Sequence, residues 1–142
     1  MELGDGTIVI DDSYNANPAS VRAALATLVD LAKPSRRSVA VLGEMKEIGD
    51  AEESEHDAIG VEVARLGVGL LVTAGGLASR IATEAARSKV ETRVAESAEA
   101  AAKIALAEIR PGDVVLVKGS RSVGTELVFR ALVGSRGRRE AP

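Results

Sequence analysis

Short runs rich in valine and isoleucine alternate with longer alanine-rich stretches, and this alternation limits the possible folds more than any other feature of the chain. A short aliphatic run bounded by turn residues is typical of a strand buried on both faces. In the longer stretches, apolar residues recur at helical spacing, as Val21, Leu25 and Leu28 do. The predicted strands are Thr7–Asp11, Ser38–Leu42, Gly69–Thr73, Glu91–Val94 and Asp113–Val117, and the predicted helices are Ala19–Ala32, Glu52–Leu66, Leu77–Ser88, Ala98–Ile109 and Gly124–Val133.

Strands that alternate with helices form βαβ units, whose right-handed crossovers place helices on both faces of a parallel sheet. We therefore expect an α/β fold, a Rossmann-like three-layer domain with a mostly parallel sheet flanked by helices. The 142 residues suffice for one core of this kind. We expect residues 1–133 to form the domain and residues 134–142, which lack periodicity, to form a flexible C-terminal tail.

Composition excludes several classes of function. The chain has one tyrosine, one phenylalanine and no tryptophan, so it lacks the aromatic platforms on which nucleic-acid bases stack. Its net charge of -3 also argues against polyanion binding. The absence of cysteine excludes disulfides and thiolate metal sites. No apolar run approaches the roughly 20 residues that cross a bilayer, so we expect a cytoplasmic protein with no membrane partner.

The loop DDSYNANP follows the first predicted strand, at the sheet edge where parallel α/β proteins bind ligands. One interpretation is structural: Asn17 caps the next helix and Pro18 occupies its first turn. That interpretation leaves Asp12, Tyr14 and Asn15 unexplained. A carboxylate at a strand end can accept hydrogen bonds from ribose hydroxyls, and a tyrosine ring can lie against a base.

The loop GEMKEIG follows the second predicted strand. Gly43 lets the backbone turn where a side chain would crowd it. Glu44 could bind an amine or lie beside a metal-bound phosphate, and the alternative is a solvated charged loop. His56 lies on the following helix, and a lone histidine is more often structural than catalytic.

The loop KGSRS follows the strongest predicted strand. Lys118 and Arg121 supply positive charge, and Ser120 and Ser122 add hydroxyls, so the loop could bind an anion at a helix N-terminus. The alternative is helix capping by Ser120 or Ser122 with the cations left in solvent.

Several familiar motifs are absent from the sequence. The chain has no G-x-x-x-x-G-K-[ST] phosphate loop and no G-x-G-x-x-G fingerprint, although Gly75 and Gly76 follow the third predicted strand. A single histidine cannot form a multi-histidine metal site, so we expect no metal site in this chain. The loops can bind and orient a ligand, and the phosphate cradle must be supplied from elsewhere.

Three segments carry a family resemblance: DDSYNANPASVRAAL, VLGEMKEIGDAEESEHDAIG and GDVVLVKGSRSVGTELV. In order and spacing, from Thr7 to Leu132, they resemble the C-terminal domain of the Mur ligases. The YNANP and KGSRS loops resemble the branch of that family that adds D-Ala-D-Ala to UDP-N-acetylmuramoyl-tripeptide in peptidoglycan synthesis. The alternatives are another Mur ligase or a folylpolyglutamate synthase C-terminal domain, and a stand-alone module that binds a nucleotide or small acid.

The resemblance implies a three-domain, ATP-dependent ligase of which this chain is one part. An N-terminal domain would hold the UDP-sugar, and a central domain would hold the phosphate loop and most of the Mg²⁺ contacts. ATP would phosphorylate the tripeptide carboxylate, and the amine of D-Ala-D-Ala would attack the acyl phosphate. We therefore expect the isolated chain to fold but to be inactive.

The resemblance also implies roles for individual residues. Asp12 would accept hydrogen bonds from the ATP ribose, and the nucleotide side of the cleft would be completed by Tyr14, Asn15 and Asn17. Three catalytic residues would face the incoming dipeptide or the acyl phosphate: Lys118, Ser120 and Arg121. Glu44 and His56 match positions assigned to substrate binding.

Overall fold

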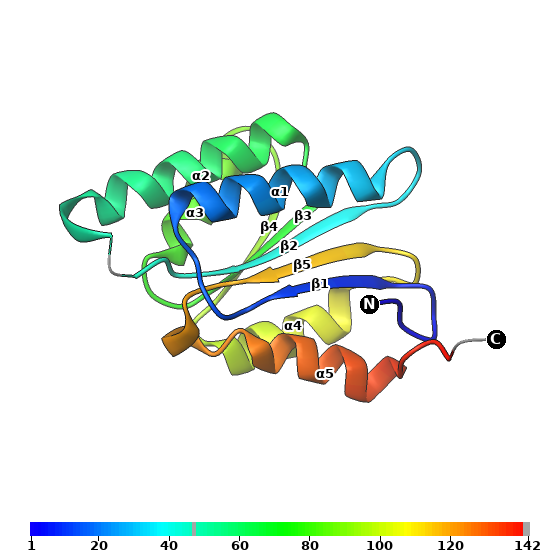
Figure 1. The fold of residues 1–142 in the computed structure, drawn as a ribbon. Helices are drawn as coiled ribbons and strands as arrows, with labels where there is room; N and C mark the ends of the chain where they lie inside the picture. The colour runs from blue at the N-terminus through cyan, green and yellow to red at the C-terminus, as the bar shows by residue number, and fades with distance from the viewer. Residues whose placement is uncertain (47, 141–142) are drawn as a thin grey trace.

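The sheet contains five parallel strands in the computed structural model, which describes residues 1–46 and 48–140. The strands are β1 (Ile8–Asp12), β2 (Ser38–Gly43), β3 (Leu70–Ala74), β4 (Glu91–Ala95) and β5 (Val114–Lys118). Their spatial order is β1-β5-β2-β3-β4, so the last strand of the sequence is inserted between the first two (Figure 1). Leu116 of β5 is aligned with Ile10 on one side and Ala40 on the other. The predicted α/β fold is confirmed.

Helices cover both faces of the sheet (Figure 1). The helices are α1 (Pro18–Ala32), α2 (Glu52–Leu66), α3 (Ala78–Arg87), α4 (Ala98–Glu108) and α5 (Glu126–Arg136), with short 3₁₀ helices η1 (Gly49–Ala51) and η2 (Arg121–Val123). The chain crosses the sheet in one direction from β1 to β4 and then returns to β5, so right-handed crossovers place α1–α3 on one face and α4 on the other. Helix α5, which follows the last strand, packs beside α4. Within the described residues, no helix has the length and apolar character needed to cross a membrane.

The core consists of two aliphatic layers, one on each face of the sheet. Along β2, Ala40 and Leu42 belong to the layer beneath α1–α3, whereas Val39 and Val41 belong to the layer against α4 and α5. Because successive side chains of a strand point to opposite faces, a strand covered on both sides must be apolar at every position. This requirement explains the uninterrupted aliphatic runs of the sequence.

Local sequence sets the start of α1. Asn17 Oδ1 accepts a hydrogen bond from the Ser20 amide at 2.9 Å, and the Asn17 amide donates to Ser20 Oγ at 3.1 Å. This reciprocal pair is a capping box, and Pro18 occupies the first position of the helix. The structural interpretation of Asn17 and Pro18 is therefore confirmed.

The C-terminal segment differs from the predicted flexible tail. Helix α5 continues to Arg136, and Arg138 forms an antiparallel bridge with Leu3. Arg136 stabilises this end, because its guanidinium donates to the Ile109 carbonyl at 2.6 Å and lies 3.2 Å from the carboxylate of Asp5. The last helix therefore ends three residues beyond the predicted Val133, whereas the flexibility of residues 134–142 stays a prediction. Residues 141–142 lie outside the described part of the chain.

Candidate functional site

The loops that follow β1, β2 and β5 meet at one edge of the sheet (Figure 1). The loops after β1 and β2 lead to helices on one face, whereas the loop after β5 leads to η2 and α5 on the other. Where adjacent connections leave a parallel sheet on opposite faces, a crevice opens at the strand ends. The crevice here has a volume of about 430 Å³ and is lined by Tyr14, Asn15, Lys46, Ser120, Arg121 and Ser122. We call it the main cleft.

Lys118 lies behind the main cleft, where it joins β5 to the loop after β1. It is buried, with 2% of its side chain exposed. Its Nζ donates to Asp12 Oδ2 at 2.5 Å and to the Asn15 carbonyl at 3.0 Å. The two residues of the ion pair face each other across neighbouring strands, because Asp12 is aligned with Lys118 in the sheet register. Lys118 therefore fixes the position of Asp12 and Asn15, and it does not line the cleft itself.

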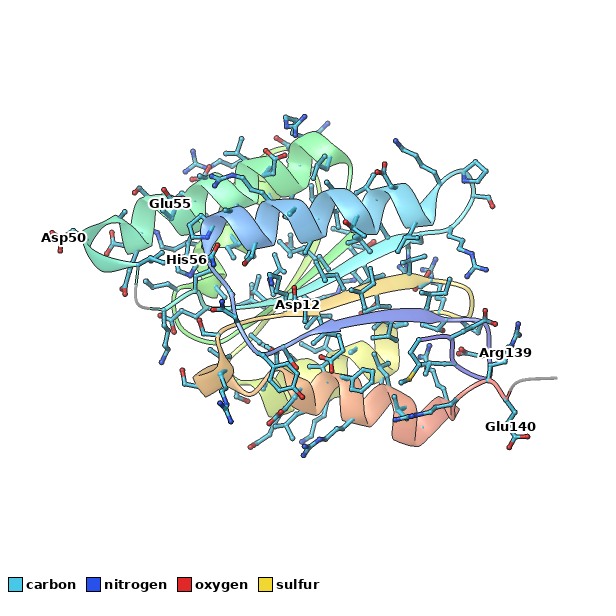
Figure 2. The ribbon with its side chains drawn as sticks, in the orientation of Figure 1. Asp12, Asp50, Glu55, His56, Arg139 and Glu140 are labelled. Atoms are coloured by element: carbon cyan, nitrogen blue, oxygen red, sulfur yellow. The ribbon has the colours of Figure 1, made fainter. Side chains whose placement is uncertain are left out.

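Asp12 remains accessible at the end of β1 (Figure 2). Its side chain is 45% exposed, and the Lys118 pair uses one of its two carboxylate oxygens. Tyr14, two residues after Asp12, is 67% exposed at the cleft wall. A carboxylate acceptor beside an exposed aromatic ring can receive a ribose and a base respectively.

Two hydrogen bonds join the loops after β2 and β5. The Ser120 amide donates to the Glu44 carbonyl at 3.1 Å. The Lys46 amide donates to Ser120 Oγ at 2.8 Å. Ser120 therefore fixes the backbone of the Lys46 loop at the cleft wall, although its hydroxyl proton is still available to donate.

His56 is fully buried, and both nitrogens of its ring are bonded to backbone. The Met45 amide donates to Nε2 at 2.9 Å, and Nδ1 lies 2.6 Å from the Glu52 carbonyl. Figure 2 shows His56 on the inner side of α2. The geometry gives no support to the predicted substrate contact of His56, because its side chain has no exposed surface.

Gly43 and Gly119 lie at the ends of β2 and β5, and both are packed against Thr125. A Cβ at Gly43 would lie 2.8 Å from Thr125 Cγ2, and a Cβ at Gly119 would lie 2.9 Å from the same methyl group. These distances are too short for a side chain to fit without movement. The two glycines therefore let Thr125, at the start of α5, close over the strand ends.

Glu44 lies outside the main cleft, in a second groove of about 290 Å³ between the loops after β2, β3 and β4. Its carboxylate lies directly against Gly76, in space that a Cβ at that position would occupy. Glu96, Glu99 and Lys46 also line this groove. The glycines after β3 thus make room for Glu44, and Lys46 lies between the two grooves.

Asn17, another predicted nucleotide contact, has a structural partner for its side-chain oxygen, the Ser20 amide. It is not among the residues that line the main cleft. Its proposed place on the nucleotide side therefore has no support in the geometry, and its role as the cap of α1 accounts for it.

One residue of the main cleft was not predicted. Lys46 belongs to a loop whose many charges resemble an ordinary solvated turn, and the bond from its amide to Ser120 holds its backbone at the cleft. Ser122 was expected either as a hydroxyl of an anion site or as a helix cap, and η2 turns this segment toward the cleft. The one signal that the sequence offered for Lys46 was its position after a strand at the ligand-binding edge.

The cleft combines an exposed aromatic ring, two cations and two hydroxyls, with an accessible carboxylate beside it. This set suits a nucleotide whose base, ribose and phosphates require different partners. In residues 1–46 and 48–140, no three or more His, Asp or Glu side chains are grouped so that they could hold a metal ion.

The chain is similar in sequence and in fold to known proteins. Residues 1–121 match the family model described as "Mur ligase, glutamate ligase domain". The UDP-N-acetylmuramoyl-tripeptide--D-alanyl-D-alanine ligase of Mycobacterium leprae is 44% identical, over 92% of this chain and 28% of its own length. The chain thus spans less than a third of this relative.

Two crystal structures are similar in fold and sequence. MurF from Acinetobacter baumannii superimposes with a TM-score of 0.78 and 28% identity, over 94% of this chain and 29% of that one. MurF ligase from Thermotoga maritima, in complex with ADP, gives a TM-score of 0.68 and 26% identity, over 92% and 28% of the two chains.

Proposed function

We propose that this chain is the C-terminal domain of a D-alanyl-D-alanine-adding ligase. The premise is that the chain belongs to the Mur ligase family, whose glutamate ligase domain it matches. The full enzyme would join D-Ala-D-Ala to UDP-N-acetylmuramoyl-tripeptide. Relatives that carry this name align with nearly the whole chain. The observation that carries the proposal is the main cleft, in which the loops after β1, β2 and β5 meet at a switch point of the sheet.

ATP fits the residues at this cleft. Asp12 would accept hydrogen bonds from the ribose hydroxyls through the carboxylate oxygen that Lys118 does not use. Tyr14 would lie against the base, and Asn15 offers amide groups beside it. When bound, ATP would supply the phosphoryl group that activates the tripeptide carboxylate for attack by the amine of D-Ala-D-Ala.

The chain's own residues would position and stabilise charge. Arg121 and Lys46 at the cleft wall would attract the phosphates or the carboxylates of the substrates. The hydroxyl groups of Ser120 and Ser122 would donate hydrogen bonds to the same groups. Lys118 would act indirectly, by holding Asp12 in the orientation in which it meets the ribose. Catalysis of this kind relies on orientation and electrostatics and needs no covalent enzyme intermediate.

The remaining contacts would come from outside this chain. We propose that an N-terminal domain binds the UDP-sugar and that a central domain contributes the phosphate loop and the Mg²⁺ ligands. The enzyme would act in the cytoplasm, with neither nucleic acid nor membrane as a partner.

A domain replacement tests the proposal. The segment of the M. leprae relative that matches this chain is replaced by this chain, and ADP formation is measured with UDP-N-acetylmuramoyl-tripeptide and D-Ala-D-Ala. We expect ligase activity that requires both substrates. In the replaced enzyme, Asp12→Ala should raise the KM for ATP about tenfold, the equivalent of one lost hydrogen bond to the ribose, and should leave kcat nearly unchanged.

Asp11→Ala is the matched control, because Asp11 is the exposed neighbour of Asp12. It should leave the KM for ATP unchanged. A second control carries the corresponding segment of the M. tuberculosis relative, which shows whether the junctions tolerate a foreign domain. If that control is active while a folded replacement with this chain is not, the ligase assignment is wrong. An unchanged KM in Asp12→Ala would remove the ribose contact alone.

A further inference from the structure

The hydrogen-bond partners of His56 select one tautomer of its ring. Because the Met45 amide donates to Nε2, that nitrogen must carry a lone pair. The ring proton therefore lies on Nδ1, 2.6 Å from the Glu52 carbonyl that accepts it. The side chain has no exposed surface, so no water is available to replace either partner. The imidazole is held as the neutral Nδ1–H tautomer.

The bond to Met45 fixes the loop after β2 at the point where it turns away from the sheet. Met45 itself is 1% exposed and belongs to the core layer beneath α1–α3. The next amide, that of Lys46, donates to Ser120 Oγ, and Lys46 lines the main cleft. A short path of bonded backbone thus runs from the buried ring through Met45 and Lys46 to Ser120.

We propose that His56 is a positioning residue for the main cleft: as a hydrogen-bond acceptor from Met45, it holds Lys46 and Ser120 in the places from which they contact a ligand. The role in catalysis rests on the proposed ligase function, but the role in shaping the loop does not. An apolar side chain could fill the same space in the core. It could not accept from the Met45 amide, which would then lose its partner in a dry environment.

Glutamine and methionine provide a matched pair of substitutions. Both are unbranched, of similar length and of similar helix propensity. Both lose the bond from Nδ1 to Glu52. Glutamine places a carbonyl oxygen close to the position of Nε2 and so keeps an acceptor for Met45, whereas methionine offers none of comparable strength. A difference between His56→Gln and His56→Met therefore isolates the acceptor.

The first measurement needs no variant. Long-range ¹H–¹⁵N NMR of the 142-residue chain distinguishes the two neutral tautomers of its single histidine. We expect the Nδ1–H tautomer. The Nε2–H tautomer would overturn the proposal, because Nε2 could not then accept from Met45.

The second measurement is amide hydrogen exchange, with calorimetric titration of ATP on the same samples. In His56→Met, the amides of Met45 and Lys46 should exchange at least tenfold faster, and ATP binding should weaken roughly fivefold to tenfold, a loss comparable to that of one hydrogen bond. In His56→Gln, exchange at both amides and ATP affinity should stay within about twofold of the unmodified chain. Equal behaviour of the two variants in exchange would overturn the proposal.

Different results would contradict the nucleotide function and the positioning role of His56. If the exchange and tautomer results are as expected but ATP does not bind to any form, His56 still positions the loop and the nucleotide function is wrong. If ATP binds and both variants bind it as the unmodified chain does, the ligase proposal stands and the positioning role is overturned.

Discussion

Lys118 supports the wall of the main cleft without lining the cleft itself. Its ammonium group is buried, and two of its hydrogen bonds go to the Asp12 carboxylate and the Asn15 carbonyl. Burying a charge is unfavourable unless it is paired and hydrogen-bonded, and both conditions are met here. The cation therefore ties the loop after β1 to the central strand and leaves one Asp12 oxygen for another partner.

Replacing Lys118 by methionine should keep the volume of the side chain and remove both bonds. We expect the free energy of unfolding to fall by about 1–3 kcal/mol, because the Asn15 carbonyl loses its partner, while the half-exposed Asp12 can be rehydrated. ATP affinity should fall as well, because Asp12 is no longer held. Urea unfolding and calorimetry measure the two effects.

Lys103→Met is the control for this change, since Lys103 is exposed on α4. It should alter neither quantity by a measurable amount. If Lys118→Met lowered stability but left ATP affinity intact, the orientation of Asp12 by Lys118 would not matter for binding.

Gly119 and Gly134 should respond to alanine in opposite directions. At Gly119 the new methyl group would meet Thr125 and the backbone of Gly43, so we expect a loss of about 1–3 kcal/mol in unfolding free energy. Gly134 is exposed within α5, and no atom lies within 4 Å of the place that a methyl group would take there, so alanine should add about 0.5–1 kcal/mol. Thermal and urea unfolding compare the two variants directly. A stabilised Gly119→Ala would contradict the packing argument.

Sequence reasoning at the residue level succeeded where a role depends on neighbours in the chain. Asn17 and Pro18 form a helix start that local spacing predicts. Lys118 and His56 could not be assigned in this way. Their partners are 106 and 11 residues distant, and whether a charged or polar side chain faces solvent or a buried acceptor depends on tertiary packing.

At the scale of elements, Arg80 joins α3 to α2. Its guanidinium donates to both carboxylate oxygens of Asp57, at 2.9 and 2.8 Å. The hydrogen bonds from Arg80 are the main reason that the pKa of Asp57 lies below its ordinary value, and the positive charge of Arg80 adds to the effect, while desolvation opposes it. The two helices are thus held by a charge-assisted pair as well as by apolar contacts.

This pair should contribute to acid sensitivity. A carboxylate whose pKa is lower in the folded state binds fewer protons there than when unfolded, so its stabilising effect is present above the ordinary range of about 4 and is lost as the pH falls through the folded pKa. Between pH 6 and pH 3, the melting temperature of Asp57→Asn should therefore fall less than that of the unmodified chain.

Arg80→Gln removes the other partner and should reduce the pH dependence by a similar amount. The double variant should show no further reduction. If the single variants and the unmodified chain had the same pH profile of melting temperature, the Asp57–Arg80 pair would have no part in acid sensitivity.

The elements themselves were largely predictable, because strands and helices that face a common core display their periodicity in the sequence. The ends of the elements were less predictable from the sequence. The last helix was expected from Gly124 but begins at Glu126, because η2 and the left-handed Gly124 first bring Thr125 over the strand ends. At its other end, Arg136 finds its partners in segments near the start of the chain and after α4, which no local pattern reveals.

In the whole molecule, the main cleft and the contact between the two ends of the chain lie at opposite edges of the sheet. The main cleft lies at the carboxyl ends of the strands, whereas Met1 and the end of α5 lie at the opposite edge (Figure 1). There, the Gly4 amide donates to the Gly137 carbonyl at 3.0 Å and the Arg139 amide to the Glu2 carbonyl at 3.0 Å. The first and last described segments are thus hydrogen-bonded to each other at the edge opposite the main cleft.

The isolated chain should therefore fold but fail as a catalyst. We expect a cooperative unfolding transition, weak binding of ATP with a Kd well above micromolar, and no ADP from ATP, UDP-N-acetylmuramoyl-tripeptide and D-Ala-D-Ala. The reason is that the sequence has no phosphate loop, so most phosphate contacts must lie elsewhere. Sub-micromolar ATP affinity or steady turnover by the purified chain would contradict this expectation.

The exposed ring at the cleft wall has an optical consequence. Tyr14 is the only tyrosine of a chain without tryptophan, so nearly all near-ultraviolet emission excited at about 280 nm originates at this one position. The protein carries an intrinsic fluorophore in the cleft itself, with no competing background from the aliphatic core. Quenching of that emission by added solutes would report events at the loop after β1 without any label.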